Sequence, residues 1–291
     1  MQLGFIGFGE AAFELSNGLK QEGLQQISAY DGNLDDPIYG QIIRDRAAKA
    51  QVCLLDSPQK VINEANMIIV AVPADKTYGV SQTLKPYLKK SSIYIDVSAS
   101  TPAIKKQVSE NVTEQGALFV DAAMMGPLPV YKHKVPILAS GSGADLFIEL
   151  MTPYGMDICK VSDNPGDASA VKLIRSIYMK GVAALLIEML EAAYEFRVED
   201  LVISSISETM NGRTFEETMN RLVTGTAIHA LRRSVELEGS IDMLESSQLD
   251  AVMTAAAKQK LQQLSQFNLK EKFKGQTPAH WLEVITALRT S

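Results

Sequence analysis

Short apolar runs separated by longer amphipathic segments dominate the first part of the chain, and this alternation restricts the fold most strongly. The runs are Leu3–Ile6, Ile27–Tyr30, Val52–Leu55, Met67–Val72, Ile93–Val97 and Phe119–Ala122. Continuous apolar strands separated by helices are typical of a parallel sheet that is covered on both faces. Ser57-Pro58 and Thr101-Pro102 each predict a helix start, with an N-cap residue followed by proline in the first turn. Two more strands are predicted near Pro136–Ala139 and Ile158–Val161.

The pattern changes to helical spacing from Ala168 onward. Residues 168–196 predict one helix about 40 Å long, interrupted only by Gly181. We expect this helix to link two domains, to bury faces against both, and to offer a face to a second subunit. Further helices are predicted at Glu199–Met210, Thr214–Leu237, Leu244–Leu264 and Pro278–Thr290. The sequence therefore predicts a mostly parallel α/β domain in residues 1–163 and an all-helical domain in residues 164–291.

Composition narrows the class of protein. The chain has 291 residues, 46% of them hydrophobic, and a formal net charge of -6, which disfavours nucleic-acid binding. No apolar stretch is long enough to cross a bilayer, and the first residues lack the basic cluster of a signal peptide. Cys53 and Cys159 lie among apolar residues, which predicts buried, reduced thiols in a cytoplasmic protein. The three histidines show no metal-ligand spacing, so no metal site is predicted.

Two glycines and an alanine stand where the first strand meets the first helix, in MQLGFIGFGEAAFELSNGL. Gly7 permits a tight turn, Gly9 lets backbone amides approach a pyrophosphate, and Ala12 keeps the helix close to the sheet. The helix N-terminus then presents unpaired amides to an anion. This context predicts a dinucleotide site of the Rossmann type. Its predicted contact residues are Gly7, Phe8, Gly9, Glu10, Ala11 and Ala12.

The end of the second strand supplies an acid, Asp31, which fits the same site. Its carboxylate can accept hydrogen bonds from the ribose hydroxyls and would repel a 2′-phosphate, so NAD is predicted over NADP. Asp31 could instead simply begin a turn with Gly32 and Asn33. Val72, Pro73 and Ser98 follow later strands and should line the cofactor crevice, although a buried strand end and a turn proline explain the first two equally well.

The start of the long helix carries the residues with the clearest chemistry. Lys172, Arg175 and Ser176 share one helix face and follow a glycine-bearing loop after the nucleotide domain. A solvated pair of cations is the usual explanation of such spacing. In a partly dry cleft, however, a lysine beside another cation has a lowered pKa and could move the proton of a hydroxyl group. Arg175 could bind a carboxylate or phosphate of the substrate.

Three separated blocks make the chain similar, over its whole length, to the β-hydroxyacid dehydrogenase superfamily, the group of 3-hydroxyisobutyrate and 6-phosphogluconate dehydrogenases. GFIGFGEAA resembles the glycine-rich start of the family, and DVSASTP resembles its substrate-binding segment. GDASAVKLIRS resembles the catalytic segment. The resemblance implies that Lys172 is the acid/base and that Ser98 bonds the substrate.

The chain departs from the family pattern at three positions. Ala168 replaces the second glycine of the catalytic segment, and Ser176 replaces its asparagine. Met125 stands where a serine usually helps to hold a carboxylate, whereas Gly126 is kept. These changes put the ordinary hydroxyisobutyrate pocket in doubt. The KLIRS phrase and the segment TAIHALRRSVELE look closer to a phosphogluconate-dehydrogenase-like NAD-binding branch that has a C-terminal domain of unknown function.

That C-terminal segment places His229, Arg232 and Arg233 within about one helical turn, with Glu236 one turn later. The helix could contribute His229 and Arg232 to a pocket for an anionic substrate, across a dimer interface. A solvated helix face, with a plain ion pair to Glu236, would explain the same spacing.

These features predict an NAD(P)-dependent dehydrogenase that acts on a small anionic hydroxy acid or its oxo form. Lys172 would move the proton, and Ser98, Met125, Gly126, Arg175 and Ser176 would contact the substrate. A homodimer or higher homo-oligomer is expected. Two alternatives stay open: a reductase of imines or oxo acids on the same fold, against which the presence of Lys172 counts, and a nucleotide-binding sensor without turnover.

Overall fold

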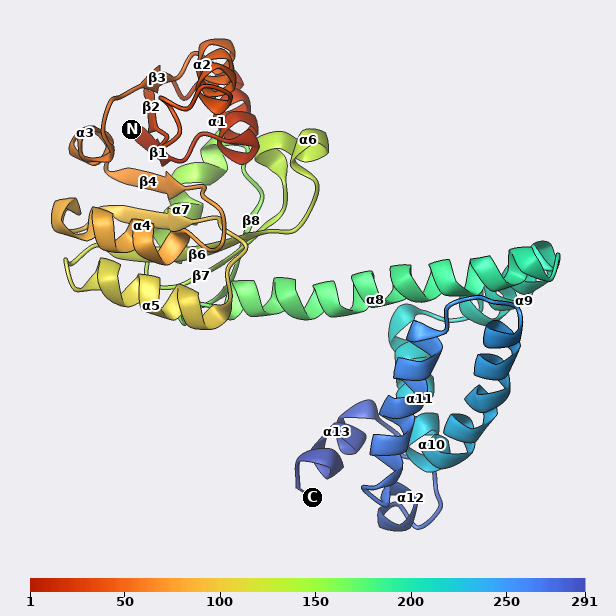
Figure 1. The fold of residues 1–291 in the computed structure, drawn as a ribbon. Helices are drawn as coiled ribbons and strands as arrows, with labels where there is room; N and C mark the ends of the chain where they lie inside the picture. Colours follow the sequence, from red (N-terminus) through yellow and green to blue (C-terminus); the bar gives the residue numbers. More distant parts are fainter. Residues whose placement is uncertain (291) are drawn as a thin grey trace. The chain divides into compact units, whose positions relative to one another are not determined.

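The computed structural model describes residues 1–290 (Figure 1). The chain divides into two compact units, Met1–Ile177 and Tyr178–Ser291. This division lies inside the long helix α8, Asp167–Glu195, whereas the boundary predicted from the sequence falls just before that helix.

The first unit is built on one sheet of eight strands, and all eight were predicted within two residues at each end. Their order is β3-β2-β1-β4-β5-β6-β7-β8, and β7 runs antiparallel to β6 while the other pairs are parallel. The strands are β1 Leu3–Ile6, β2 Ile27–Tyr30, β3 Cys53–Leu54, β4 Met67–Val70, β5 Ile93–Asp96, β6 Leu118–Met124, β7 Ile137–Ser140 and β8 Ile158–Ser162.

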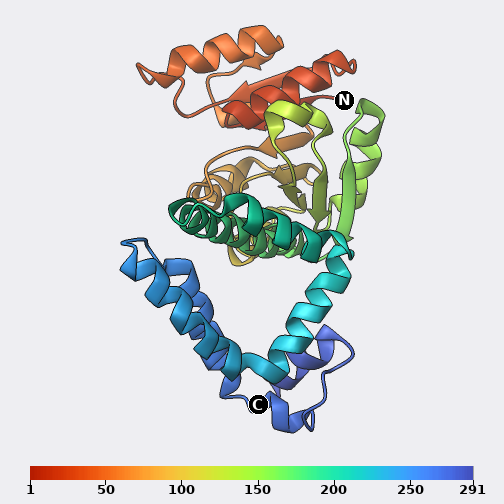
Figure 2. The same ribbon diagram turned by 90° about the vertical axis from the view of Figure 1, so that its right-hand side faces the viewer.

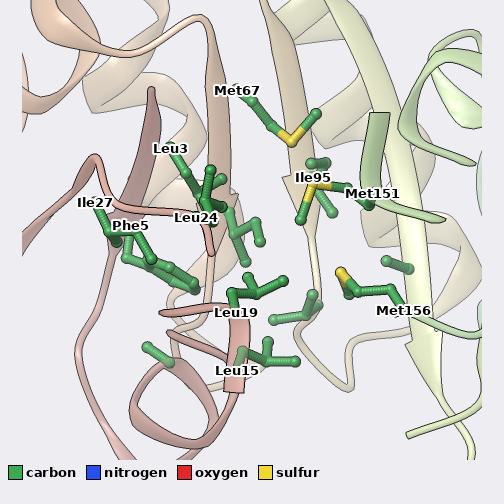
Figure 3. Packing of buried hydrophobic residues seen from close by; sticks show 14 of the residues in the cluster. Leu3, Phe5, Leu15, Leu19, Leu24, Ile27, Met67, Ile95, Met151 and Met156 are labelled. Atoms are coloured by element: carbon green, nitrogen blue, oxygen red, sulfur yellow. The ribbon is translucent and has the colours of Figure 1, made fainter. Parts of the chain in front are cut away.

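Helices cover both faces of this sheet, as the continuous apolar strands predicted. The helices are α1 Glu10–Gln21, α2 Tyr39–Ala50, α3 Pro58–Glu64, α4 Thr77–Leu84, α5 Pro102–Thr113, α6 Leu128–Tyr131 and α7 Ala144–Met151, with short 3-10 turns at Lys85–Tyr87, Lys132–Lys134 and Thr152–Tyr154. Side chains alternate along each strand: Met67 and Ile69 pack with α1, α2 and α7 (Figure 3), and Ile68 packs with α3, α4 and α5.

The second unit is all-helical within the described residues. It holds most of α8 together with α9 Glu199–Asn211, α10 Phe215–Ser246, α11 Val252–Ser265, α12 Leu269–Lys272 and α13 Trp281–Arg289. The backbone of His229 leaves helical geometry (φ -119, ψ 17), so α10 bends there, as Figure 2 shows. The fold class is therefore the predicted one, a Rossmann-type α/β domain followed by helices.

Two predictions about local structure were wrong, and one short helix was missed. Cys53 and Cys159 are free but exposed, because they lie on β3 and β8, the two edge strands of the sheet. The helix break expected between Leu237 and Leu244 does not exist, since α10 continues to Ser246. The short helix α12 was not predicted.

Membrane insertion was examined over residues 1–290. None of the helices there has the length and apolar character that a bilayer crossing requires.

Candidate active site

The glycine turn between β1 and α1 has the geometry of an anion cradle. Gly7 has a φ of +86°, and a Cβ atom there would lie 2.4 Å from the carbonyl oxygen of Ala71, so only glycine fits. A Cβ atom on Gly9 would meet nothing within 4 Å, which leaves open space above the turn. No side chain caps the N-terminus of α1, so its first amides stay available to a ligand.

Asp31, directly after β2, is joined to this cradle. Its side chain is 8% exposed, and Oδ2 accepts a hydrogen bond of 2.6 Å from the amide of Phe8. Oδ1 accepts one of 2.8 Å from the amide of Asn33, so Asp31 also begins the turn that the alternative interpretation expected. The bond to Phe8 was not predicted, because it links positions 23 residues apart. Ribose binding by Asp31 stays a prediction.

A cavity of about 350 Å³ opens at the carboxyl ends of β1 and β2, the edge where sheets of this type bind ligands. Its lining residues are Ile6, Tyr30, Pro58, Asp75, Lys76, Gly79, Val80, Thr83 and Leu84. Val72, half-buried, and Pro73, exposed, follow β4 but are not among them. Sequence position alone did not single out Tyr30 or Lys76, since the residues that line the cavity come from four separate strand–helix units.

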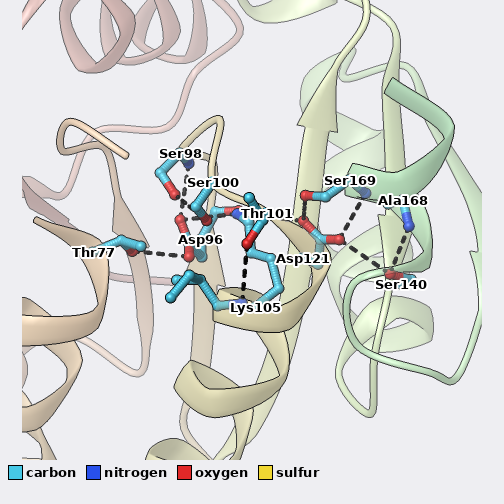
Figure 4. Close-up of polar contacts among 11 residues, drawn as sticks. Thr77, Asp96, Ser98, Ser100, Thr101, Lys105, Asp121, Ser140, Ala168 and Ser169 are labelled. Carbon is cyan, nitrogen blue, oxygen red and sulfur yellow. Dashed lines mark hydrogen bonds and ion pairs between the residues drawn. The ribbon is translucent and has the colours of Figure 1, made fainter. Parts of the chain in front are cut away.

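Ser98 lies two residues beyond the end of β5, and β4 separates this strand from β1 in the sheet. It is buried, its amide donates a 2.8 Å hydrogen bond to Asp96, and its hydroxyl lies 3.1 Å from that of Ser100. Figure 4 shows that these residues form one end of a polar network that reaches the start of α8. The network therefore connects the two regions predicted to touch the substrate.

At the other end of the network, the first turn of α8 is fixed to the sheet. The amide and hydroxyl of Ser169 donate hydrogen bonds of 2.8 and 2.7 Å to Asp121 on β6, and the amide of Ala168 donates to Ser140 on β7 at 3.1 Å. Ala168 is completely buried, so the departure from glycine at this position is accommodated. Lys172 follows Ser169 by three residues and shares its helix face.

Lys172 is half-buried, and within residues 1–290 its amine has no hydrogen-bond or ion-pair partner. Burial lowers its pKa from the ordinary value, the positive charge of Lys105 lowers the pKa further, and the carboxylate of Asp121 opposes both effects. The enzymatic prediction requires this amine to face a bound nicotinamide near the strand ends, and the catalytic role of Lys172 stays a prediction.

The remaining predicted substrate residues of the first unit differ in exposure. Arg175 is exposed, while Ser176 is half-buried. Met125, just after β6, is half-buried, and its amide donates to Pro136 at 2.8 Å. A Cβ atom on Gly126 would lie 3.1 Å from the ring of Tyr131, so this glycine makes room for the tyrosine.

His229 and Arg232 belong to the second unit, which is described by itself. His229 is half-buried at the bend of α10, a feature that helical spacing did not predict. Arg232 forms an exposed ion pair of 3.3 Å with Glu236, as the solvated-face alternative expected. Arg233 donates a hydrogen bond to Thr226. Substrate binding by His229 and Arg232 stays a prediction.

Comparison with known proteins agrees with the architecture. Residues 2–147 match the NAD binding domain of 6-phosphogluconate dehydrogenase, and residues 193–264 match a domain of unknown function, DUF1932. An uncharacterized 28.5 kDa protein of Methanothermus fervidus is 27% identical over 89% of this chain and 96% of its own length. Human mitochondrial 3-hydroxyisobutyrate dehydrogenase is 30% identical over 129 residues, which cover 43% of this chain and only 36% of that enzyme.

Solved structures extend the comparison over nearly the whole chain. A conserved protein of unknown function, described as structurally similar to 3-hydroxyacid dehydrogenases, is 31% identical, with a TM-score of 0.63 over 91% of this chain and 97% of its own. A Myxococcus stipitatus imine reductase variant in complex with NAD+ has a TM-score of 0.74 over 99% of this chain and 98% of its own, at 14% identity, which shows the shared fold alone.

NAD(P) is thus the cofactor of the first unit, as the glycine turn predicted. The cradle at Gly7 and Gly9, with uncapped amides on α1, fits its pyrophosphate. The fold, the glycine turn and the matches to both segments together establish that this chain belongs to the β-hydroxyacid dehydrogenase superfamily, with a 6-phosphogluconate-dehydrogenase-type NAD-binding domain followed by a DUF1932 segment.

Proposed function

We propose that the protein is an NAD-dependent oxidoreductase that interconverts a small anionic hydroxy acid and its oxo form, with Lys172 as the acid/base. The observation that carries this proposal is half-buried Lys172, whose amine has a lowered pKa and no partner within residues 1–290. A titrating group held in this way, beside the strand ends of a nucleotide-binding sheet, is typical of a functional site.

The chemistry divides between cofactor and protein. The nicotinamide, when bound, accepts a hydride from the carbinol carbon during oxidation or returns it during reduction. The neutral amine of Lys172 takes the hydroxyl proton as the substrate is oxidised, and the ammonium form gives it back in the reverse direction. Because a lowered pKa increases the neutral fraction near pH 7, the burial of Lys172 favours the oxidation step.

Substrate binding is assigned to groups that favour an anion. Ser98 offers a hydroxyl beside the Asp96 network, and Arg175 offers an exposed guanidinium group two residues before the end of the first unit. Ser176 and Gly126 complete the proposed set on this unit. Met125 gives this side of the pocket an apolar thioether in place of a family serine, which supports a substrate other than 3-hydroxyisobutyrate.

We also propose that the protein works as a homo-oligomer, because the helical unit leaves much apolar surface uncovered. Tyr194 and Leu201 are both about three-quarters exposed, and the buried core of this unit is small. Large apolar patches of this kind mark interaction surfaces. In an oligomer, His229 and Arg232 would contribute cationic groups to the substrate site.

Substrate screening tests the activity directly. For oxidation, a panel of carboxylic and phosphorylated hydroxy acids is incubated with NAD and with NADP. For reduction, the corresponding oxo acids are incubated with NADH and with NADPH, both with and without amines. Absorbance of the reduced cofactor reports turnover. Activity confined to imines would favour the imine reductase alternative, and tight NADH binding without turnover on the whole panel would favour the sensor.

Lys172→Ala is the decisive variant. It should lower kcat by about 10²–10⁴-fold, because the proton then lacks an acceptor, while NADH affinity stays at the wild-type value. The matched control is Lys180→Ala, which removes an exposed lysine from the same helix and should leave kcat unchanged. Stopped assays and NADH fluorescence titration measure the two quantities. Near-normal turnover in Lys172→Ala would eliminate the assignment.

A further inference from the structure

A second lysine, Lys105 on α5, lies at the centre of the polar network and has no role in the chemistry described so far. Its side chain is 0% exposed. Its Nζ donates to the carbonyl oxygen of Asp96 at 2.8 Å and lies 3.1 Å from Asp96 Oδ1 and 3.3 Å from Asp121 Oδ1 (Figure 4). Lys105 therefore forms one hydrogen bond to a backbone carbonyl and ion pairs with two separate carboxylates.

One arm of the network runs from Lys105 to the Ser98 loop. Asp96, at the end of β5, is completely buried, and its Oδ2 accepts a 2.9 Å hydrogen bond from the hydroxyl of Thr77. Its Oδ1 accepts the amide of Ser98 at 2.8 Å. Because Asp96 accepts the amide of Ser98, the contacts of Lys105 and Thr77 that orient the Asp96 carboxylate also orient the backbone of Ser98.

The other arm runs from Lys105 to α8. Asp121 is completely buried, and both of its oxygens receive hydrogen bonds from Ser169 in the first turn of the helix. Two carboxylates and one ammonium group leave the buried cluster with an excess of negative charge. The N-terminal amides of α8 face this excess, and the helix dipole offsets part of it.

We propose that Lys105 is a positioning residue, which clamps Asp96 to Asp121 and thereby holds the helix turn that carries Lys172 in a fixed position relative to the Ser98 loop. Its relevance to catalysis rests on the proposed function of Lys172. Burial of an unpaired charge raises the free energy of the folded state by several kcal/mol. The ion pairs that buried Lys105 forms with the two carboxylates are therefore strongly favoured. Without Lys105, two anions would be forced together under the start of α8.

Lys105 also acts on a quantity that can be measured, the pKa of Lys172. The groups that face the Lys172 amine are Lys105 from α5 and Asp121 from β6, and Asp167 and Arg175 flank it on α8. Lys105 lowers the pKa of Lys172, whereas Asp121 raises it. Asp96 and Asp121 keep their hydrogen bonds from Thr77, Ser98 and Ser169 when Lys105 is replaced. Removing the charge of Lys105 should therefore raise the pKa of Lys172.

The test compares Lys105→Gln with Lys106→Gln, which removes the same charge from an exposed position on the same helix. The lysines that solvent reaches, Lys172 among them, are ¹³C-methylated. The Lys172 resonance is assigned by its loss in Lys172→Arg, and its titration is followed by NMR. Lys105→Gln should move the Lys172 midpoint upward by about one pH unit. Lys106→Gln should leave it at the wild-type value. With a hydroxy acid from the panel, Lys105→Gln should also lower kcat for oxidation at pH 7 more than tenfold without changing the KM for NAD.

An unchanged Lys172 midpoint together with wild-type hydrogen exchange of the peptide 166–176 in folded Lys105→Gln would overturn the proposal. If this variant does not fold, the double variant Lys105→Met/Asp121→Asn removes cation and anion together, a change that cores tolerate better. Hydrogen exchange of the peptide 166–176 should then be faster than in the wild type, and wild-type exchange would equally refute the clamp. Failure of the proposed function is separate: it appears as turnover in Lys172→Ala, a result that the titration does not depend on.

Discussion

At the scale of single residues, Asp31 stabilises the glycine turn and is also predicted to bind the ribose of the cofactor. Its carboxylate accepts the amide of Phe8 at 2.6 Å, so the acid that is expected to meet the ribose also holds the glycine turn in shape. A substitution that changes cofactor preference should therefore change the turn as well. Leaving the buried amide of Phe8 without an acceptor costs about 1–3 kcal/mol.

Cofactor preference is the measurement that tests Asp31. We expect NADH to raise the Tm of the wild-type protein more than NADPH at equal concentration, because the carboxylate opposes a 2′-phosphate. Asp31→Asn removes the charge but keeps an acceptor for Phe8, and should narrow the difference. Asp35→Asn, an exposed change in the same turn, should leave the difference unchanged. A larger Tm shift with NADPH in the wild type would contradict the interpretation of Asp31.

Local sequence patterns singled out some residues of the candidate site but not others. Gly7 was predictable because a tight turn after a strand leaves a pattern in adjacent residues. Lys172 was singled out because its neighbours at helical spacing are unusual, and its role stays a prediction. Lys105 was not, since it stands beside Lys106 as one of two ordinary helix lysines. Its burial depends on Asp96 and Asp121, which reach it only when separate strands pair.

At the scale of elements, the nucleotide helix α1 rests on the turn that follows α6. His133 in that turn is buried, and a Cβ atom on Gly18 would lie 1.9 Å from its Nδ1. His133 Nε2 also lies 3.4 Å from Oε1 of Glu22, just after α1. Gly18 is therefore the position that allows the helix to approach the turn closely.

Glycine-to-alanine substitutions in two helices separate close packing from helix propensity. Gly18→Ala should lower the free energy of unfolding by about 1–3 kcal/mol, because the added methyl group overlaps His133. Gly79→Ala, in α4, meets nothing within 4 Å and should be neutral or stabilising by about 0.5–1 kcal/mol. Urea unfolding without cofactor measures both. Equal stability of the two variants would rule out the contact as a constraint.

Elements were predicted more accurately in the sheet than among the C-terminal helices. Strand runs are short, apolar and bounded by polar turns, so their limits can be seen in the sequence. A break was expected near Gly239, yet α10 passes through it, because one glycine costs a helix only about 1 kcal/mol and packing against α11 outweighs that cost. The bend at His229 has no sequence signal such as proline.

At the scale of the whole molecule, the uncovered apolar helices predict self-association. Leu201→Lys, at a position that is 74% exposed on α9, should convert the assembly to a smaller species, because a charge is then buried at the interface. Val130→Lys, at a residue that is 70% exposed in the first unit, is the matched control and should leave the mass unchanged. Light scattering after gel filtration measures both. A monomeric wild-type protein at micromolar concentration would contradict the proposed oligomer.

The continuity of α8 has a practical consequence for anyone who wishes to produce the nucleotide-binding portion alone. The compact units divide after Ile177, only a little more than one turn beyond Lys172. A recombinant fragment that ended there would end in a fraying helix. The amine of Lys172 would then lie on a backbone that unwinds rather than in the interior of a stable helix. Such a fragment would lack a stable position for the acid/base that we propose, so truncation should extend past Glu195, where the helix itself stops.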